Sequence, residues 1–477
     1  MPRREVSERI IALLGHSPTP GQEEAAMHIS GFLHEHQPTL LLLKGYAGTG
    51  KTTLISALVR FLPEIRAKSV LLAPTGRAAK VLANYSGSRA YTIHKRIYKH
   101  FSTPEGRSAL ALQNNPGRNT IFIVDEASMI PDNNVPEDFG SFSPRNILDD
   151  LIEYVYQGEN NRLILIGDNA QLPPVGIDIS PALDLKYLKS TYSLKFHHYE
   201  LTEVVRQKQE SGILGNATFI RNKLLSEEME LPLFLPPAED VKDINGTELE
   251  EHLHTAFASK EGEGTVIITR SNKRANIFNQ EIRNRVLFRE EELSTGDLIM
   301  VVKNNYFWLP KDSKAGFIAN GDLAEVLRIR KIEDMYGFRF ADISIRLIDY
   351  PDENDLDVKI LLESISADGP SLPRKKKDEL FQEILKDFDD EPRKQKRLEK
   401  IRQSPYYNAL EVKFAYALTC HKTQGGQWDS VFIDAPYLKD DVIDAETVRW
   451  LYTAITRAKE KLYLVNFREE FFSDQVL

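Results

Sequence analysis

The sequence predicts an α/β protein built on a doubly wound parallel sheet. Four short apolar runs have the length and composition of strands that are buried on both faces, and helical stretches separate them. That alternation favours parallel strands with helices on both faces of the sheet. Ligands bind at the carboxyl ends of such strands, so the polar segments that follow the runs are the candidate site. The four runs span residues 39–44, 69–73, 120–124 and 162–166.

A glycine-rich loop follows the first run and opens a helix. Its pattern, Gly45-x4-Gly50-Lys51-Thr52, matches the P-loop, whose backbone N–H groups cradle phosphates at a helix N-terminus. The lysine of such a loop reaches the β- and γ-phosphates, and its hydroxyl residue holds Mg²⁺. A chance glycine turn is the alternative, which the strand–loop–helix context disfavours. We therefore expect an ATP site with Mg²⁺ that is formed by Gly45, Gly48, Gly50, Lys51, Thr52 and Thr53.

Two carboxylates end the third run. Asp125 and Glu126 follow an apolar strand about seventy residues after the P-loop, a context in which Asp125 holds Mg²⁺ and Glu126 orients or deprotonates the attacking water. Without that P-loop, a solvated strand end would be the better interpretation. The fourth run leads into the segment 167–176, where Gln171 can sense a γ-phosphate.

The whole segment Gly167–Gly176 resembles motif III of superfamily 1 helicases, and further motifs of that superfamily follow the expected order. They span residues 73–79, 91–94, 201–207, 417–425 and 451–459. The resemblance runs from about Pro18 to Phe467, and its details are most similar to superfamily 1B, the RecD-like and Dda-like 5′→3′ DNA helicases. Thr423, where the family commonly has serine, keeps the hydroxyl, whereas Gly426 and Gln427 depart from the usual apolar continuation.

The resemblance implies roles for residues outside the P-loop. Arg206 and Arg457 would neutralise charge on the transferred phosphoryl group, although a surface ion pair is the ordinary role of an arginine. Gln22 would read adenine, with a helix cap as the alternative, and Gly425 would lie at the nucleotide. His94 and His421 could equally be structural. The implied single-strand contacts are Pro74, Thr75, Gly76, His94, Phe101, Thr419, His421, Lys422 and Gln424.

The resemblance also implies the domain organisation. Two RecA-like domains would comprise residues 1–200 and residues 201–296 with 404–477, and short alternating strands within 297–403 predict an inserted SH3-like β-barrel. A β-hairpin pin would lie at about 95–119, with Phe101 or Tyr98 as its wedge and a surface loop as the alternative. The segment 374–402 holds eleven basic and eight acidic side chains. We expect it to be an exposed helix with a solvated face, and the cluster 374–377 could touch a phosphate or a partner.

Composition limits how such a protein could hold DNA. With 61 basic and 70 acidic residues the net charge is −9, so we expect a confined groove and few phosphate contacts. The single cysteine, the charged N-terminus and the short apolar runs favour a cytoplasmic chain without a membrane segment.

The leading hypothesis is therefore an ATP-dependent DNA helicase that moves 5′→3′ on single-stranded DNA and unwinds junctions. We expect a monomer, with DNA repair or DNA replication proteins as partners. The alternatives are an RNA-directed or opposite-polarity translocase, the ATPase subunit of a nuclease complex, and a regulatory subunit with a decayed ATPase. Intact Lys51, Asp125 and Glu126 argue against the last.

Overall fold

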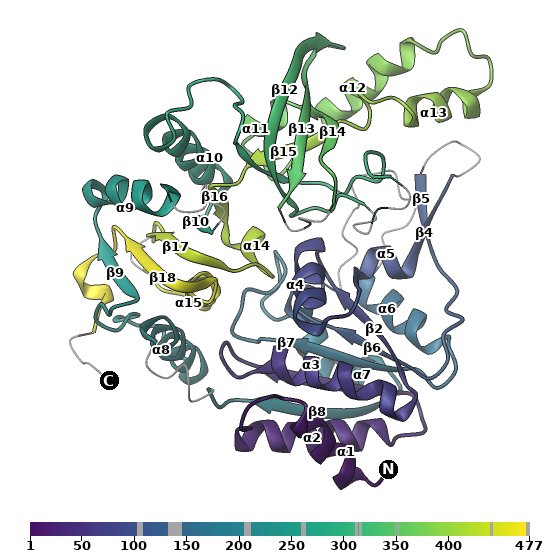
Figure 1. The fold of residues 1–477 in the computed structure, drawn as a ribbon, viewed down its shortest axis with the longest axis vertical. Coiled ribbons are helices and arrows are strands. Elements are labelled where there is room, and N and C mark those ends of the chain that lie inside the picture. The colour runs from purple at the N-terminus through teal and green to yellow at the C-terminus, as the bar shows by residue number, and fades with distance from the viewer. Residues whose placement is uncertain are drawn as a thin grey trace.

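The computed structural model describes residues 1–102, 108–131, 146–204, 211–258, 264–310, 313, 317–348, 350, 353–438 and 442–473. Two parallel sheets lie beside each other, and a closed barrel lies against both of them (Figure 1). The predicted α/β class with a small inserted barrel is therefore confirmed. Among the described residues, no helix combines the length and the apolar character that crossing a membrane requires.

The first sheet has six parallel strands in the order β3-β2-β6-β7-β1-β8. Leu41 and Leu43 of β1 pack into one core with α1, α2 and α3, while Leu40 and Leu42 pack into another core with α5 and α6. Helices on both faces explain why β1 is apolar throughout. The bounds are β1 (Thr39–Gly45), β2 (Lys68–Ala73), β3 (Ala90–Thr92), β6 (Thr120–Val124), β7 (Arg162–Gly167) and β8 (Lys195–Leu201), with α1 (Arg3–Ala12), α2 (Pro20–Leu33), α3 (Lys51–Phe61), α4 (Gly76–Ser86), α5 (Ile93–Ile97), α6 (Ile147–Tyr156) and α7 (Leu185–Thr191).

The second sheet has five parallel strands in the order β16-β10-β17-β18-β9. The bounds are β9 (Val241–Ile244), β10 (Thr265–Thr269), β16 (Ala417–Thr419), β17 (Trp428–Asp434) and β18 (Ala458–Val465), with α8 (Gly212–Ser226), α9 (Gly246–Ala258), α10 (Asn272–Glu281), α14 (Cys420–Thr423) and α15 (Ala445–Ile455).

The barrel closes between its first and last strands. Most of its neighbouring strands are antiparallel, but β14 and β15 pair in parallel. The charged segment was expected to be one exposed helix, but it forms two helices. They pack with the start of β13 and the end of β14 around a small core of their own. The bounds are β11 (Leu298–Val301), β12 (Leu323–Met335), β13 (Phe338–Leu347), β14 (Leu356–Leu361) and β15 (Leu410–Phe414), with α11 (Glu363–Ser366), α12 (Arg374–Lys386) and α13 (Lys394–Arg402).

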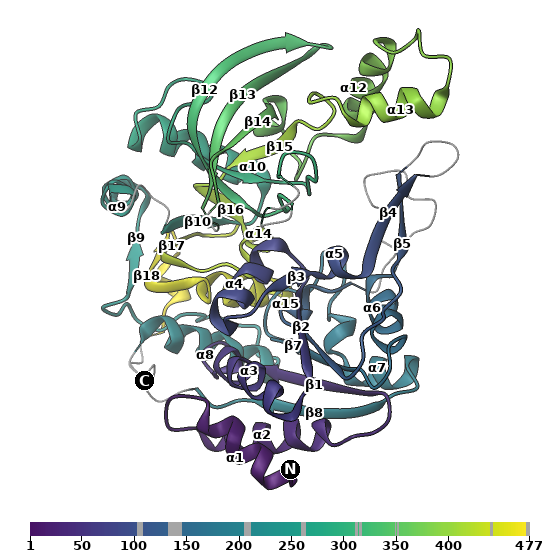
Figure 2. The same ribbon diagram turned by 45° about the vertical axis from the view of Figure 1, so that its right-hand side comes forward.

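An antiparallel strand pair projects from the first sheet toward the side of the barrel that carries α12 and α13 (Figure 2). It consists of β4 (Tyr98–Ser102) and β5 (Ser108–Leu112), paired from Tyr98 opposite Leu112 to Ser102 opposite Ser108. The strands lie where the pin was expected. Of the two suggested wedges, Tyr98 is buried and its hydroxyl donates to Asp150 at 2.6 Å, so it does not lie at the tip. The side chain of Phe101 lies outside the described part of the structure.

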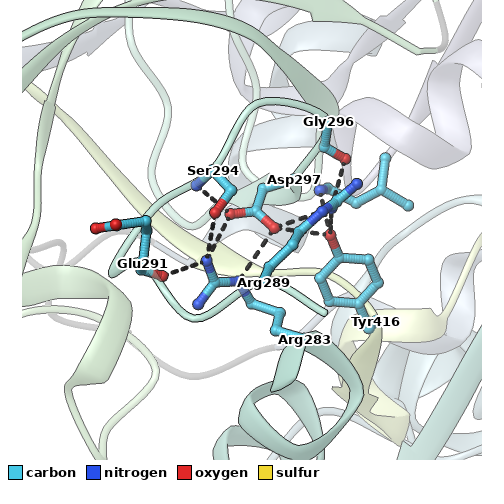
Figure 3. Close-up of polar contacts among 8 residues, drawn as sticks. Arg283, Arg289, Glu291, Ser294, Gly296, Asp297 and Tyr416 are labelled. Atoms are coloured by element: carbon cyan, nitrogen blue, oxygen red, sulfur yellow. Dashed lines mark hydrogen bonds and ion pairs between the residues drawn. The ribbon is translucent and has the colours of Figure 1, made fainter. Parts of the chain in front are cut away.

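The two chain segments that join the barrel to the second sheet meet at one buried carboxylate (Figure 3). Asp297 lies just before β11, and Tyr416 lies between β15 and β16. The Asp297 carboxylate accepts hydrogen bonds from Arg283 and the Tyr416 hydroxyl, at 3.1 and 3.0 Å, and pairs with Arg289 at 3.0 Å. Asp297 is fully buried, so these donors replace the water that its charge has lost. The barrel is thereby held to the second sheet at both crossings.

Candidate active site

The candidate phosphate-binding loop turns at the carboxyl end of β1 and opens α3. Gly48 and Gly50 have φ angles of +77° and +80°, a backbone conformation that favours glycine. A Cβ at Gly45 would lie 2.9 Å from Thr49 Oγ1. The Lys51 ammonium donates to the carbonyls of Gly45 and Tyr46, so the charge lies over the loop. The Thr52 hydroxyl is on an exposed side chain in the first turn of the helix.

The two predicted carboxylates lie at the end of β6. Asp125 accepts hydrogen bonds from the Tyr85 hydroxyl and from the Glu126 N–H. Glu126 has a φ angle of +52°, a strained conformation for a residue other than glycine, of a kind that clusters at functional sites. Burial raises the pKa of the Glu126 carboxyl to about 7. The charge of Asp125 adds to the rise, while Arg457 and Lys51 oppose it. A carboxylate with this pKa can serve as a general base near neutral pH.

Segment Gly167–Gly176 lies between the two sheets. Gln171 is buried, and its Oε1 has no hydrogen-bond partner among the described residues. The next residue, Leu172, has both its backbone N–H and its carbonyl bonded by side chains from the second half of the protein. The Leu172 N–H donates to Thr453 Oγ1 at 2.8 Å, and its carbonyl accepts from Gln424 Nε2 at 2.8 Å. Gln424, predicted to contact DNA, therefore lies buried in this interface.

Arg457 lies just after α15, beside the second sheet, and its side chain is buried. Its guanidinium donates to the carbonyls of Thr453 and Gly426, at 3.0 and 3.2 Å, and to the Thr456 hydroxyl at 3.1 Å. These bonds fix the guanidinium, and its charge acts on Glu126 of the first sheet. Arg206, the other predicted arginine, lies outside the described residues.

The structure is compatible with both roles that the sequence left open for Gln22, a helix cap and a contact with adenine. Its Oε1 accepts from the Thr19 N–H at 3.1 Å, which completes a capping box at the start of α2. Its Nε2, however, is buried and has no partner among the described residues. A buried amide donor is costly when it is unpaired, so this atom suits a hydrogen-bond acceptor on a bound nucleotide.

The predicted strand contacts lie along α4, α5 and α14. Thr75 caps α4 through Ala78, and Pro74 beside it is half-buried. A Cβ at Gly76 would lie only 2.2 Å from the Cβ of Ala319, in the barrel. Gly425 has a φ of +74° and also packs closely, in its case against α4. A Cβ at Gly425 would lie 2.8 Å from the Cβ of Ala78. Glycine at these two positions lets α4 pack against both the barrel and the second sheet.

Burial limits the charge of the basic side chains in this region. It lowers the pKa of His94 to about 4 and also lowers that of His421. It lowers the pKa of Lys422 to about 8, with the charge of Lys413 adding to the effect. At neutral pH His94 is therefore uncharged, and Lys422 is a cation. Thr419, at the end of β16, is half-buried beside them.

Three residues that the sequence motifs did not single out join the halves of this site. The Tyr452 hydroxyl bonds both Ala47 and Asp168, and the Arg77 guanidinium lies 4.0 Å from the centre of the Trp428 ring. Asp168 and Tyr452 lie within recognised motifs, but only the fold shows that they touch. For Arg77 the sequence carried no signal beyond its place in the segment 73–79.

Comparison with known proteins agrees with this geometry. An AAA domain family model matches residues 18–223, and a UvrD-like helicase C-terminal domain model matches residues 414–465. The chain is 24% identical to the ATP-dependent DNA helicase dda of Enterobacteria phage T4, over 94% of this chain and 99% of that protein. It is 26% identical to the ATP-dependent RecD2 DNA helicase of Deinococcus radiodurans, over 89% of this chain but 46% of that protein.

Among solved structures, the fold is similar to a Pif1 helicase from a study of DNA unwinding at forked double-stranded DNA. The TM-score is 0.50 at 16% identity, over 96% of this chain and 95% of that one. At this identity the likeness concerns the fold alone.

Proposed function

We propose that this protein, a superfamily 1B helicase of the RecD-like and Dda-like group, is an ATP-dependent DNA helicase that moves 5′→3′ on single-stranded DNA. One observation carries the proposal: Glu126 lies where Lys51 of the first sheet and Arg457 of the second both act on its carboxyl. A nucleotide bound between the sheets would therefore be contacted from both sides. Residues 1–200 would be one motor domain and residues 201–296 with 415–477 the other. The inserted domain would run from 297 to 414, beyond the expected end at 403, because β15 (Leu410–Phe414) closes the barrel.

ATP would be held by the turn around Gly48 and Gly50, with Lys51 on its terminal phosphates and Gln22 at the base. Glu126 would take the proton of the attacking water, and Gln171 would sense the γ-phosphate. Arg457, and Arg206 by its motif, would balance the charge that develops on the phosphoryl group. Thr53 would add its N–H to the phosphate cradle.

The donor set at the site also fits a magnesium ion. Thr52 and Asp125 offer the hydroxyl and carboxylate oxygens that Mg²⁺ prefers, and the Tyr85 hydroxyl and the Glu126 N–H orient the carboxylate. Bound there, Mg²⁺ would supply charge neutralisation on the phosphates.

The DNA strand would cross the open edges of both sheets. Pro74, Thr75 and His94 would contact it on the first, and Thr419, His421 and Lys422 on the second. Gly76, expected among these contacts, is buried beneath Ala319 of the barrel. Gln424, which is buried between the two halves of the protein, would act on the strand only indirectly, through its bond to Leu172. Such small polar groups position a backbone without reading sequence. Closure of the sheets on ATP and reopening after hydrolysis would move the strand by alternating grip. Protein partners in DNA repair or DNA replication, the monomeric state and a cytoplasmic location are part of the same proposal.

A tailed-duplex assay tests this function. Duplexes with a 5′ or a 3′ single-stranded tail are incubated with ATP and the full chain, and Lys51→Ala serves as the inactive control. We expect unwinding from the 5′ tail alone. Unwinding only from the 3′ tail would reverse the polarity, and ATP turnover that responds to polyuridylate but not to oligodeoxythymidine would make RNA the substrate.

A further inference from the structure

The hydroxyl of Tyr452 connects the phosphate-binding loop to segment Gly167–Gly176. Tyr452 lies on α15, next to the second sheet, and is almost fully buried. Its hydroxyl accepts a hydrogen bond from the Ala47 N–H at 2.9 Å and donates one to Asp168 Oδ2 at 2.7 Å. One oxygen atom of the second half of the protein thus holds two elements of the first.

The bond to Asp168 is buried, and the bond from the Ala47 N–H is partly buried. Asp168 is almost fully buried, and its other oxygen accepts from the Ala170 N–H at 2.9 Å. Burial and the nearby Asp168 charge keep the pKa of Tyr452 well above its usual range, so the phenol remains a donor. Loss of the hydroxyl would leave the buried Asp168 carboxylate short of one donor and the Ala47 N–H without its acceptor. The first deficit is the costlier, because the carboxylate is almost fully buried.

The same segment is also tied to the candidate DNA face. Leu172, four residues after Asp168, is held by Thr453 and by Gln424. Gln424 follows His421 and Lys422 in the chain, and Thr453 follows Tyr452 on α15. If a bound strand displaced α14, the movement would be transmitted to segment 167–176 through the Gln424–Leu172 hydrogen bond. From Asp168 it would pass through Tyr452 to Ala47 of the phosphate-binding loop.

We propose that Tyr452 is a positioning residue that couples strand binding to ATP turnover. When the two sheets close on ATP, its hydroxyl fixes the position of the phosphate-binding loop relative to segment 167–176. The Tyr452 side chain itself contacts neither a phosphate nor the attacking water. This inference rests on the proposed function, because it takes stimulation of ATP turnover by single-stranded DNA as the quantity that Tyr452 controls.

Tyr452→Phe removes only the hydroxyl. With saturating oligodeoxythymidine we expect kcat for ATP to fall about tenfold, the scale of one hydrogen bond to a charged group, while KM for ATP changes less than about twofold. Asp168→Asn should reduce stimulation similarly. Because the two residues share one bond, the double variant should lose little more than either single variant.

Tyr416→Phe is the matched control. The Tyr416 hydroxyl also donates to a buried aspartate, Asp297, and accepts from a backbone N–H, that of Leu298, each at 3.0 Å (Figure 3). It differs from Tyr452 in accepting a further bond from Arg289, at 2.6 Å. It lies at the barrel junction, away from the nucleotide site. We expect this variant to keep the wild-type kcat and the wild-type stimulation by DNA.

Thermal unfolding of each variant accompanies the kinetics. Equal loss of stimulation in Tyr452→Phe and Tyr416→Phe, unchanged stimulation in Tyr452→Phe, or fully additive losses with Asp168→Asn would each overturn the inference. A wild-type chain whose ATP turnover does not respond to oligodeoxythymidine would instead contradict the proposed function, so the two failures are distinguishable.

Discussion

Lys80 and Asp322 form a buried ion pair between α4 and the barrel, with Nζ 2.9 Å from Oδ1 and side chains 6% and 0% exposed. The other carboxylate oxygen accepts from the Ala319 N–H at 2.9 Å. Ala319 is the residue that covers Gly76. The pair therefore seats the barrel on the helix whose first turn carries the expected strand contacts, so the barrel and the DNA face are mechanically linked.

Removal of one member of this pair should be costly. We expect Asp322→Ala to lower the free energy of unfolding by about 3 kcal/mol, because it leaves the Lys80 charge buried without its carboxylate. Lys80→Met combined with Asp322→Leu should recover part of that loss, because the Lys80 charge is gone but the buried Ala319 N–H still loses its acceptor. The exposed pair Arg9–Glu64, at 2.9 Å, is the control, and Glu64→Ala should cost at most about 1 kcal/mol. Denaturant titration measures all three, and equal costs at the two pairs would contradict the expectation.

The second prediction concerns Gly48 of the phosphate-binding loop. A Cβ there would lie 2.9 Å from Leu214 Cδ1 of α8, and φ is +77°. Gly48→Ala should therefore abolish most ATP turnover, because both the loop and its contact with α8 must shift. Gly87→Ala separates backbone strain from side-chain contact. Gly87 has a φ of +65°, and a Cβ there would have no atom of another described residue, its chain neighbours aside, within 4 Å. It should cost about 1 kcal/mol of stability and leave kcat unchanged. Similar kcat values for the two variants would refute this explanation.

Local chemistry explains which features the sequence could predict. The P-loop and the Asp125–Glu126 pair each require a strand, a turn and a few adjacent residues, so a short segment carries the whole signal. The barrel was visible for a similar reason, because alternating strands and turns within 297–403 are local patterns.

Contacts across the interface could not be predicted in the same way. Tyr452 and Asp168 are 284 residues apart, and the sequence does not reveal how the two sheets face each other. Gln22 shows a different limit, because its carbonyl oxygen accepts the capping hydrogen bond while its amide nitrogen has no partner in the part of the chain that the structure describes. A local sequence pattern cannot separate a capping role from a nucleotide-binding role when the same side chain can serve both.

The third prediction tests Glu126 as the general base. Glu126→Gln keeps the side-chain size but cannot take a proton, so kcat should fall about 10²- to 10⁴-fold while the affinity for ATP is kept. Binding of a fluorescent ATP analogue and steady-state turnover measure the two effects. Glu159→Gln, at an exposed ion pair with Arg118, should change neither. Full turnover in Glu126→Gln would exclude this role.

The last prediction concerns the charge of Lys422. Burial and Lys413 lower its pKa to about 8, so the side chain is charged at pH 7 and loses its charge as the pH rises through 8. If Lys422 neutralises a phosphate, affinity for single-stranded DNA should fall across that interval. Arginine stays charged there, so Lys422→Arg should bind without this pH dependence. Lys413→Met removes the repelling charge and should move the fall to higher pH. Fluorescence anisotropy of a labelled oligodeoxythymidine between about pH 6.5 and 9.5 measures each curve, and the same fall in Lys422→Arg would show that another group titrates.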